Sequence, residues 1–235
     1  MSGENHAARN QRAFETPLAV DHYRREGVNE REEIAFSRIP PGSRLLDIGC
    51  GAGRTTRYFE SRPLSVVAMD YSFGMVAAAK ATAGASRYFT MDAVSLAFQP
   101  YSFDVVVFSA NGIDYIHPYA KRIEAMREIW RVVRPGGLFI FSSMSRFLPR
   151  RPRNILPFAR VIFRDRERSY VENRSEFGAV LRYATTPAGE KEALERVGFQ
   201  LEEIVTMRKF RWVRSLSLIG LLDMAPYFIC RRPPR

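Results

Sequence analysis

Short apolar runs alternate with segments of helical spacing along the first two-thirds of the chain. Runs rich in β-branched and aromatic residues predict five strands, over 44–48, 64–70, 86–92, 103–110 and 138–143. The run at 103–110 is almost continuously apolar, as is typical of a strand that is buried on both faces. Strands that alternate with helices in this way are typical of βαβ units, and therefore of a mostly parallel sheet.

Helical spacing fills the gaps between these strands. Residues 118–133 place Ile123, Met126, Ile129, Trp130 and Val133 on one face, and the following RPGG is expected to end that helix. Further helices are predicted from residue 54 onward and over 72–83 and 186–199. The apolar segments 200–208 and 225–232 are expected to add two more strands to the same sheet.

The pattern breaks down between Met144 and Thr186, where prolines, arginines and aromatic residues follow no clear period. A structureless loop of this length is uncommon in a compact domain. We therefore predict a cap, at about residues 145–185, that has its own short helices and lies over the carboxyl edge of the sheet. The polar residues 1–19 are predicted to be a flexible tail, and residues 20–235 to form one domain.

The chain is strongly basic, with a formal net charge of +11, but the charge is uneven. Basic residues outnumber acidic ones by 10 to 4 over 146–182 and by 7 to 1 over 207–235, against 17 to 15 over 1–145. Arginine makes up 32 of the 36 basic residues. The excess is consistent with an anionic partner near the cap, and equally with a compositional bias toward arginine.

Several classes of protein are disfavoured by composition. The apolar stretch 215–222 is far shorter than the roughly 20 residues that cross a bilayer, so no transmembrane helix is predicted. Peripheral contact with a membrane is compatible with the sequence. Cys50 and Cys230 lie far apart, which favours a reducing, cytoplasmic location. The three histidines and two cysteines have no metal-ligand spacing, so no metal site is predicted. Nothing in the pattern indicates an oligomeric state.

The glycine-rich stretch LLDIGCGAG, residues 45–53, follows the first predicted strand. In open α/β sheets, ligands bind beside the carboxyl ends of strands where the strand order reverses. The spacing Gly-x-Gly-x-Gly is one residue short of the dinucleotide fingerprint, and Asp47 stands at the end of the strand. A carboxylate beside a pyrophosphate is unfavourable, whereas a cationic group there would be stabilised.

Two more carboxylates follow the next strands. Asp70 ends the second strand 19 residues after Gly51, a position from which a carboxylate binds ribose hydroxyls. Asp92 ends the third strand, and its side chain with the backbone N–H of Ala93 could bind an adenine edge. The strand ends therefore indicate a site for an adenosine that is joined to a positively charged group.

These motifs together resemble those of one family. The segments LLDIGCGAG, VVAMDYS, YFTMDA, FDVVVFS and EIWRVVRPGGLFIFSS, in this order and spacing, are similar to the class I S-adenosylmethionine-dependent methyltransferases over about residues 20–144. The resemblance implies a Rossmann-like, doubly wound α/β fold with a mostly parallel seven-stranded sheet and an antiparallel last strand, here with the basic cap inserted. It also implies S-adenosylmethionine as cofactor and S-adenosylhomocysteine as product.

The resemblance implies a role for individual residues. The methionine part of the cofactor would contact Asp47 and the loop that contains Gly49, Cys50, Gly51 and Gly53. The implied adenosine contacts are Asp70 for the ribose, Tyr71 and Met75 for the adenine faces, and Asp92 and Ala93 for the adenine edge. Ser109 would lie beside the sulfonium, and Tyr23 and Arg24 resemble a lid over the cofactor.

Methyl transfer is an in-line displacement, so the protein mainly aligns the acceptor and excludes water. A hydroxyl acceptor would be helped by a general base. The segment SANGIDYIHPY after the fourth strand offers His117, which we favour, and Asp114. The dipeptide His117-Pro118 is explained equally well as a turn.

The acceptor itself is less well defined by the sequence. Enzymes that methylate amino groups of nucleic-acid bases commonly have an Asn/Asp-Pro-Pro-aromatic run after the fourth strand, where this chain has SANG. We therefore favour a small-molecule acceptor, and O-methylation over N- or C-methylation. The acceptor is expected to be anionic, a sugar or lipid-linked, and an anionic group would suit the basic cap because arginine binds phosphate and carboxylate bidentately. The alternatives are an RNA methyltransferase that uses the basic C-terminal segments, and a non-catalytic protein that binds the cofactor.

Overall fold

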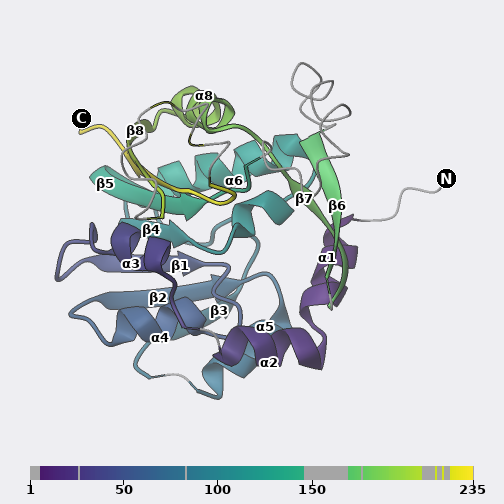
Figure 1. The fold of residues 1–235 in the computed structure, drawn as a ribbon. Coiled ribbons are helices and arrows are strands. Elements are labelled where there is room, and N and C mark those ends of the chain that lie inside the picture. Colours follow the sequence, from purple (N-terminus) through teal and green to yellow (C-terminus); the bar gives the residue numbers. More distant parts are fainter. Residues whose placement is uncertain are drawn as a thin grey trace.

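A seven-stranded sheet forms the centre of the molecule, in the order β3-β2-β1-β4-β5-β9-β8 (Figure 1). The computed structural model describes residues 6–25, 27–82, 84–145, 169–175, 177–207, 215, 219 and 223–234. The strands of the sheet are β1 (Arg44–Ile48), β2 (Ser65–Asp70), β3 (Arg87–Thr90), β4 (Phe103–Phe108), β5 (Val133–Ser142), β8 (Gln200–Val205) and β9 (Tyr227–Arg231).

The direction of the strands confirms the predicted fold class. β1 pairs in parallel with β2 on one side and with β4 on the other, so the strand order reverses at β1. β9, the last strand in the chain, is antiparallel to both β5 and β8. The sheet is thus doubly wound and mostly parallel, and ligands of such sheets bind at the carboxyl ends of the strands on either side of the reversal.

Helices cover both faces of this sheet (Figure 1). The chain contains α1 (His6–Phe14), α2 (Pro17–Arg25), α3 (Glu30–Phe36), α4 (Arg54–Glu60), α5 (Phe73–Lys80), the 3-10 helix η1 (Gly112–Tyr115), α6 (Tyr119–Val132) and α8 (Pro187–Val197). A separate hairpin is formed by β6 (Tyr170–Ser175) and β7 (Gly178–Tyr183). None of the helices in the described ranges is both long enough and apolar enough to span a bilayer.

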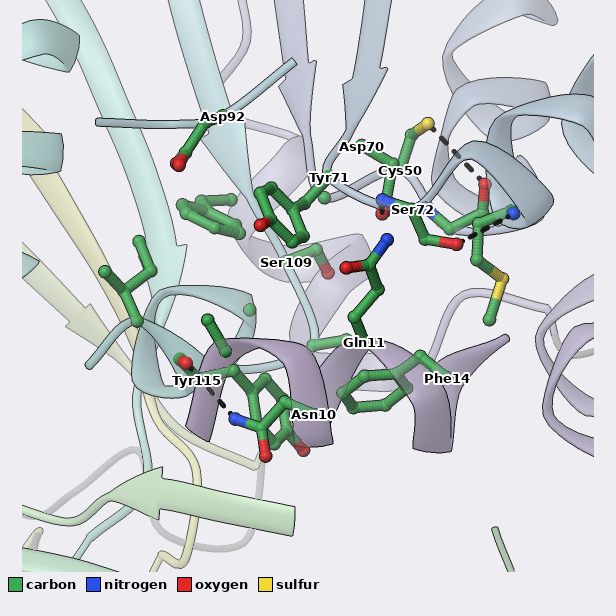
Figure 2. A pocket seen from close by; sticks show the side chains of 18 of the residues that line it. Asn10, Gln11, Phe14, Cys50, Asp70, Tyr71, Ser72, Asp92, Ser109 and Tyr115 are labelled. Atoms are coloured by element: carbon green, nitrogen blue, oxygen red, sulfur yellow. Dashed lines mark hydrogen bonds between the residues drawn. The ribbon is translucent and has the colours of Figure 1, made fainter. Parts of the chain in front are cut away.

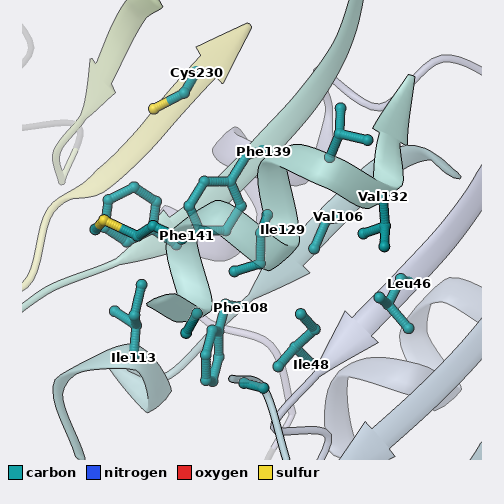
Figure 3. Close-up of a cluster of buried hydrophobic side chains, with 14 of the residues drawn as sticks. Leu46, Ile48, Val106, Phe108, Ile113, Ile129, Val132, Phe139, Phe141 and Cys230 are labelled. Atoms are coloured by element: carbon teal, nitrogen blue, oxygen red, sulfur yellow. The ribbon is translucent and has the colours of Figure 1, made fainter. Parts of the chain in front are cut away.

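Successive residues of the central strands face opposite sides of the sheet, and each side has its own core. Leu46 of β1 packs with Ile129 of α6, in the cluster that Figure 3 shows, whereas Leu45 packs with Phe36 of α3 on the other face. Burial of one such side chain stabilises the fold by about 1.5–3 kcal/mol. The two cores hold the carboxyl ends of β1, β2 and β4 in fixed relative positions.

The start of β5 corrects one boundary. The prediction placed a stop at RPGG and a strand from residue 138, but β5 begins at Val133 and runs through this segment. Gly136 adopts a φ of 79°, and a Cβ on Gly137 would lie 2.7 Å from the carbonyl oxygen of Asp104. The glycines therefore allow the strand to bend and to approach β4 closely, rather than only ending the helix.

Two predictions, about the N-terminal tail and about the cap, also change. The flexible tail predicted over residues 1–19 is wrong for residues 6–14 and for the start of α2 at Pro17, because these residues are helical. The predicted cap over 145–185 contains the β6–β7 hairpin where the structure describes it. Residues 146–168, which carry most of the cap's arginines, lie outside the described residues.

Candidate active site

A cavity of about 420 Å³ opens at the carboxyl ends of β1, β2 and β4, with α1 across it (Figure 2). Its position is the one expected for a doubly wound sheet. The residues that line it come from α1 and α2, from the glycine loop and the start of α4, from the ends of β2 and β4 and the segments that follow β2, β3 and β4, and from α5, η1 and the start of α6. They are Ala7, Asn10, Gln11, Phe14, Tyr23, Gly49, Cys50, Gly51, Arg54, Thr55, Asp70, Tyr71, Ser72, Met75, Asp92, Val94, Phe108, Ser109, Ala110, Gly112, Tyr115, Ile116, His117, Pro118 and Lys121.

The glycine loop turns sharply between β1 and α4. Gly49, Gly51 and Gly53 all have positive φ, at 65°, 54° and 85°. A Cβ on Gly49 would lie only 2.7 Å from the ring of Phe108, so this position requires glycine for space as well as for conformation. The backbone of the loop is thereby exposed to the cavity.

Asp70 ties this loop to the end of β2. Its two carboxylate oxygens each accept a backbone hydrogen bond of 2.8 Å, one from Gly51 and one from Ser72. Burial raises the pKa of Asp70, and hydrogen bonds from Ser72, Gly51 and Tyr71 partly oppose this effect. A carboxylate can accept about four hydrogen bonds, so Asp70 can still accept one from a ligand hydroxyl.

Tyr71 and Asp92 lie at the ends of neighbouring strands, on the side of the cavity opposite α1 (Figure 2). Tyr71 is 48% exposed, so its ring is available for stacking on a flat ligand. Met75 is buried, and its backbone N–H is capped by the Ser72 hydroxyl at 3.1 Å. One oxygen of Asp92 accepts a hydrogen bond from the backbone N–H of Val94 at 3.0 Å.

Asp47 does not line the cavity, contrary to the predicted contact with a ligand. It is fully buried, and one of its oxygens accepts hydrogen bonds of 2.7 Å from the hydroxyls of Thr55 and Thr56. Burial raises its pKa to about 6, although both threonines and Arg54 oppose the shift. Asp47 therefore holds the first turn of α4 in place behind the glycine loop.

Three other predicted cofactor residues are also absent from the lining: Gly53, Ala93 and Arg24. Gly53 is the N-cap of α4, and Ala93 is buried in the core. Arg24 is exposed, and its carbonyl oxygen accepts a hydrogen bond of 2.5 Å from Arg57. The other predicted positions do line the cavity: Tyr23, Gly49, Cys50, Gly51, Asp70, Tyr71, Met75, Asp92 and Ser109.

Ser109, at the end of β4, belongs to a buried polar cluster. Its hydroxyl donates to Glu32 of α3 at 2.5 Å and lies 2.6 Å from the hydroxyl of Tyr227. Glu32 also pairs with both terminal nitrogens of Arg54 at 2.6 Å. Arg54 and Ser109 line the cavity while Glu32 and Tyr227 lie behind them. Sequence reasoning missed Glu32 and Arg54 because they lie 22 residues apart and no motif links them.

The two predicted catalytic residues are placed differently. His117 lines the cavity, and its ring makes T-shaped contacts with the rings of His6 and Tyr170, each with a centroid distance of 4.7 Å. Asp114 does not line the cavity and is fully buried, where it contacts Arg122 at 3.5 Å and accepts from Ser143 at 2.8 Å. Burial raises its pKa to about 7. Because Asp114 is buried and its contacts are with the protein, we infer that it supports η1.

Helix α1 was missed as part of the site. Its Asn10 is buried and acts as a clamp: the side-chain amide donates to the Leu181 carbonyl at 2.8 Å and accepts from the Leu181 N–H at 2.8 Å. The same amide nitrogen donates to the Tyr115 carbonyl at 3.3 Å. The sequence of α1 is polar and did not predict a helix. For α2 a signal was present, because proline favours the first helical position and Pro17 begins that helix.

The β6–β7 hairpin completes the cover next to α1. Arg9 of α1 donates to the Ala179 carbonyl at 3.0 Å, and the Tyr170 hydroxyl donates to the Ile116 carbonyl at 2.6 Å. The hairpin, α1 and the loop after η1 are therefore linked in one assembly. Among the described residues, no group of three His, Cys, Asp or Glu side chains could hold a metal ion.

Comparisons with known proteins agree with this geometry. A family model for a methyltransferase domain matches residues 46–141. A malonyl-[acyl-carrier protein] O-methyltransferase of Enterobacter lignolyticus is 28% identical over 131 residues, which are 54% of this chain and 51% of that protein. A demethylmenaquinone methyltransferase of Renibacterium salmoninarum is 33% identical over 105 residues, 45% of this chain and 43% of that protein.

The chain thus spans about half the length of the curated relatives it matches. A solved structure of an S-adenosylmethionine-dependent methyltransferase from Methanosarcina mazei superposes with a TM-score of 0.69 at 16% identity, covering 89% of this chain and all of that one. This similarity shows that the two chains share a fold.

Proposed function

We propose that this chain, which belongs to the class I S-adenosylmethionine-dependent methyltransferases, transfers a methyl group from that cofactor to a small-molecule acceptor. One observation carries the proposal: Asp70, Asp92, Ser109 and His117 all line a single cavity. Asp70 and Asp92 suit an adenosine, and Ser109 and His117 would lie beside the reacting groups.

The residues present fit this cofactor. Two carboxylates and an exposed glycine-loop backbone favour a ligand that carries hydroxyls and a net positive charge, and disfavour a pyrophosphate. Asp70 would bind the ribose hydroxyls, Tyr71 and Met75 the adenine faces, and Asp92 the adenine edge. The loop from Gly49 to Gly51 would hold the methionine part. When bound, S-adenosylmethionine supplies an electrophilic methyl group on a sulfonium.

The remaining wall would bind the acceptor. Phe14, Val94, Tyr115 and Ile116 give it an apolar and partly aromatic surface, and α1 lies over it to exclude water. Lys121, on the first turn of α6, lines the cavity and would attract an anionic acceptor. We favour O-methylation, in which a ring nitrogen of His117 takes the proton of the acceptor hydroxyl as the new bond forms.

The proposal is tested by binding and by transfer. Calorimetry with S-adenosylmethionine should show one site per chain. With cofactor that is radiolabelled on its methyl group, label should appear on small phenolic or carboxylic acceptors and not on RNA. His117→Ala should lower kcat by about 10² and leave cofactor affinity unchanged, because a general base acts only on the acceptor. His22→Ala is the control, since His22 does not line the cavity.

Each result has a clear meaning. If calorimetry detects no cofactor binding, the methyltransferase proposal fails. If label is transferred to RNA, with an affinity that falls steeply as salt rises, the acceptor is a nucleic acid and the small-molecule proposal fails. If His117→Ala leaves the rate unchanged at every pH, His117 is not the base.

A further inference from the structure

Glu32 is a fully buried carboxylate that the proposed reaction does not use. It accepts two hydrogen bonds of 2.6 Å from Arg54, one of 2.5 Å from Ser109, and one of 2.9 Å from Tyr227. Its second role is local, because it accepts from the Asn29 N–H at 2.8 Å and so completes the capping box of α3. One carboxylate thus joins α3, α4, β4 and β9.

Two of these partners face the cavity. Arg54 directly follows the glycine loop and is 9% exposed, and Ser109 ends β4 and is 4% exposed. Burial alone would raise the pKa of Glu32, but hydrogen bonds and charge from Arg54, with further hydrogen bonds from Ser109 and Asn29, hold the pKa below its usual value. Glu32 is therefore an anion, and it is bidentately paired with a cation in the cavity wall.

The charge of Arg54 creates a difficulty for the ligand. An arginine guanidinium is always protonated, and S-adenosylmethionine carries a sulfonium cation that would lie near the same loop. Two cations in a partly desolvated cavity repel each other strongly, because the effective dielectric constant there is low. The product, S-adenosylhomocysteine, has a neutral thioether and would not experience this repulsion.

We propose that Glu32 cancels the charge of Arg54 in the cavity wall and thereby removes the repulsion that Arg54 would otherwise exert on the cationic sulfonium of the substrate cofactor, whereas the neutral thioether of the product is indifferent to this charge. This inference rests on the proposed function, because it assumes that the cavity binds both ligands. Glu32 acts through Arg54 and Ser109 and is a positioning residue. Its effect lies in charge selectivity, which hydrogen bonding alone would not produce.

Other charges near Arg54 determine the conditions of the test. Asp47 is the second carboxylate whose charge Arg54 affects, and Asp70 lines the cavity itself. Because burial raises the pKa of Asp47 to about 6, its ionisation could change when Glu32 is replaced. Binding should therefore be measured at pH 8, well above this value.

The test compares the dissociation constants of S-adenosylmethionine and S-adenosylhomocysteine, measured by calorimetry, for the wild type and Glu32→Gln. The amide keeps the size of the side chain but removes its charge. We expect S-adenosylmethionine to bind roughly tenfold more weakly and S-adenosylhomocysteine to bind nearly as well as before. Glu32→Asp, which keeps the charge, should retain the wild-type ratio of the two constants.

Two further variants isolate the role of charge. Tyr227→Phe removes a neutral contact of Glu32 and should leave the ratio unchanged. Arg54→Met removes the cation itself. In this variant, binding of S-adenosylmethionine relative to S-adenosylhomocysteine should be at least as strong as in the wild type. If Glu32→Gln does not fold, as judged by circular dichroism, Arg54→Met decides the question. Weaker binding of S-adenosylmethionine relative to S-adenosylhomocysteine in that variant would contradict the proposal.

The outcomes separate this inference from the proposed function. If the wild type binds neither ligand, the proposed function fails. If the wild type binds both, and Glu32→Gln weakens both equally or leaves the ratio unchanged, Glu32 has only a structural role and this inference is overturned.

Discussion

The cofactor side and the acceptor side of the cavity differ in how their residues are held. On the cofactor side, Gly49, Gly51 and Asp70 lie at the ends of adjacent central strands, which the β1–β2 pairing and the hydrogen bond from the Gly51 N–H to the Asp70 carboxylate hold together. On the acceptor side, α1 and the β6–β7 hairpin, more than 150 residues apart in the chain, meet through side chains such as Asn10 and Arg9. The cofactor side thus consists of the strand ends themselves, whereas the acceptor side consists of α1 and the β6–β7 hairpin, which lie outside the sheet.

This difference has a functional consequence. A site that is built on packed strands tolerates little movement, because the cores on both faces of the sheet oppose it. A cover held by a few side-chain contacts can open at a much lower free energy than global unfolding. We therefore expect substitutions on the cofactor side to affect stability and affinity strongly, and substitutions on the acceptor side to affect ligand exchange.

The largest effect should come from Gly49→Ala. The new Cβ would lie 2.7 Å from the Phe108 ring, at a φ of 65°. Strain and overpacking together should lower the free energy of unfolding by about 3 kcal/mol, measured by urea denaturation. Gly42→Ala is the matched control, because Gly42 has a φ of 78° and no atom within 4 Å of the new Cβ. It should cost only about 1 kcal/mol.

Equal losses in these two variants would contradict the close contact between the glycine loop and β4. A larger loss for Gly42→Ala would contradict the idea that the cofactor side is the less adaptable of the two regions.

Asp70→Asn should weaken S-adenosylmethionine binding by about 100-fold. The amide can accept a hydrogen bond from only one of the Gly51 and Ser72 N–H groups, and it lacks the charge that strengthens hydrogen bonds to ribose hydroxyls. Calorimetry measures the loss. Glu192→Gln, at an exposed ion pair on α8, is the control and should bind normally. Binding of Asp70→Asn within twofold of the wild type would exclude Asp70 from the cofactor site.

The sequence predicted the cofactor side well because its signals are local. The glycine spacing and the carboxylates that end strands, such as Asp70 and Asp92, depend on residues a few positions apart. All five strands predicted before residue 145 are present. Asp47 is one of the exceptions: no motif indicates that the hydroxyls of Thr55 and Thr56 bind one of its carboxylate oxygens.

The acceptor side could not be predicted in the same way. α1 is polar, and its contact with β7 depends on Asn10 meeting Leu181, a pairing that neither segment shows by itself. Asp114 looked like a base because it follows β4, but its partners Arg122 and Ser143 lie on α6 and directly after β5. Contacts between distant segments are fixed by tertiary packing, which periodicity and motif spacing do not encode.

Asn10→Asp should speed the release of the cofactor about tenfold, because the acid loses the hydrogen bond to the Leu181 carbonyl and places a negative charge against it. Stopped-flow displacement measures the release rate. Amide hydrogen exchange should rise in residues 6–14 and remain unchanged in β1 and β4. Arg12→Ala, at an exposed position of α1, is the control. Increased exchange throughout the sheet would mean that the cover is not an independent unit.

The smallest effect concerns pH and the support beneath η1. Burial raises the pKa of Asp114 to about 7 from its ordinary 3.8. Between these values the unfolded chain has lost the proton while the folded chain keeps it. The contribution of Asp114 to stability therefore falls as pH rises from about 4 to about 7. Asp114→Asn removes this dependence, since the amide does not titrate in that range.

The free energy of unfolding of Asp114→Asn, taken relative to that of the wild type, should therefore be about 1 kcal/mol higher at pH 8 than at pH 5. Urea denaturation at the two pH values measures the difference, and the shift from Asp47 cancels because both proteins share it. A difference of the same size at both pH values would show that Asp114 is ionised throughout. Arg122, which contacts Asp114 at 3.5 Å, would then stabilise its charged form in the folded chain.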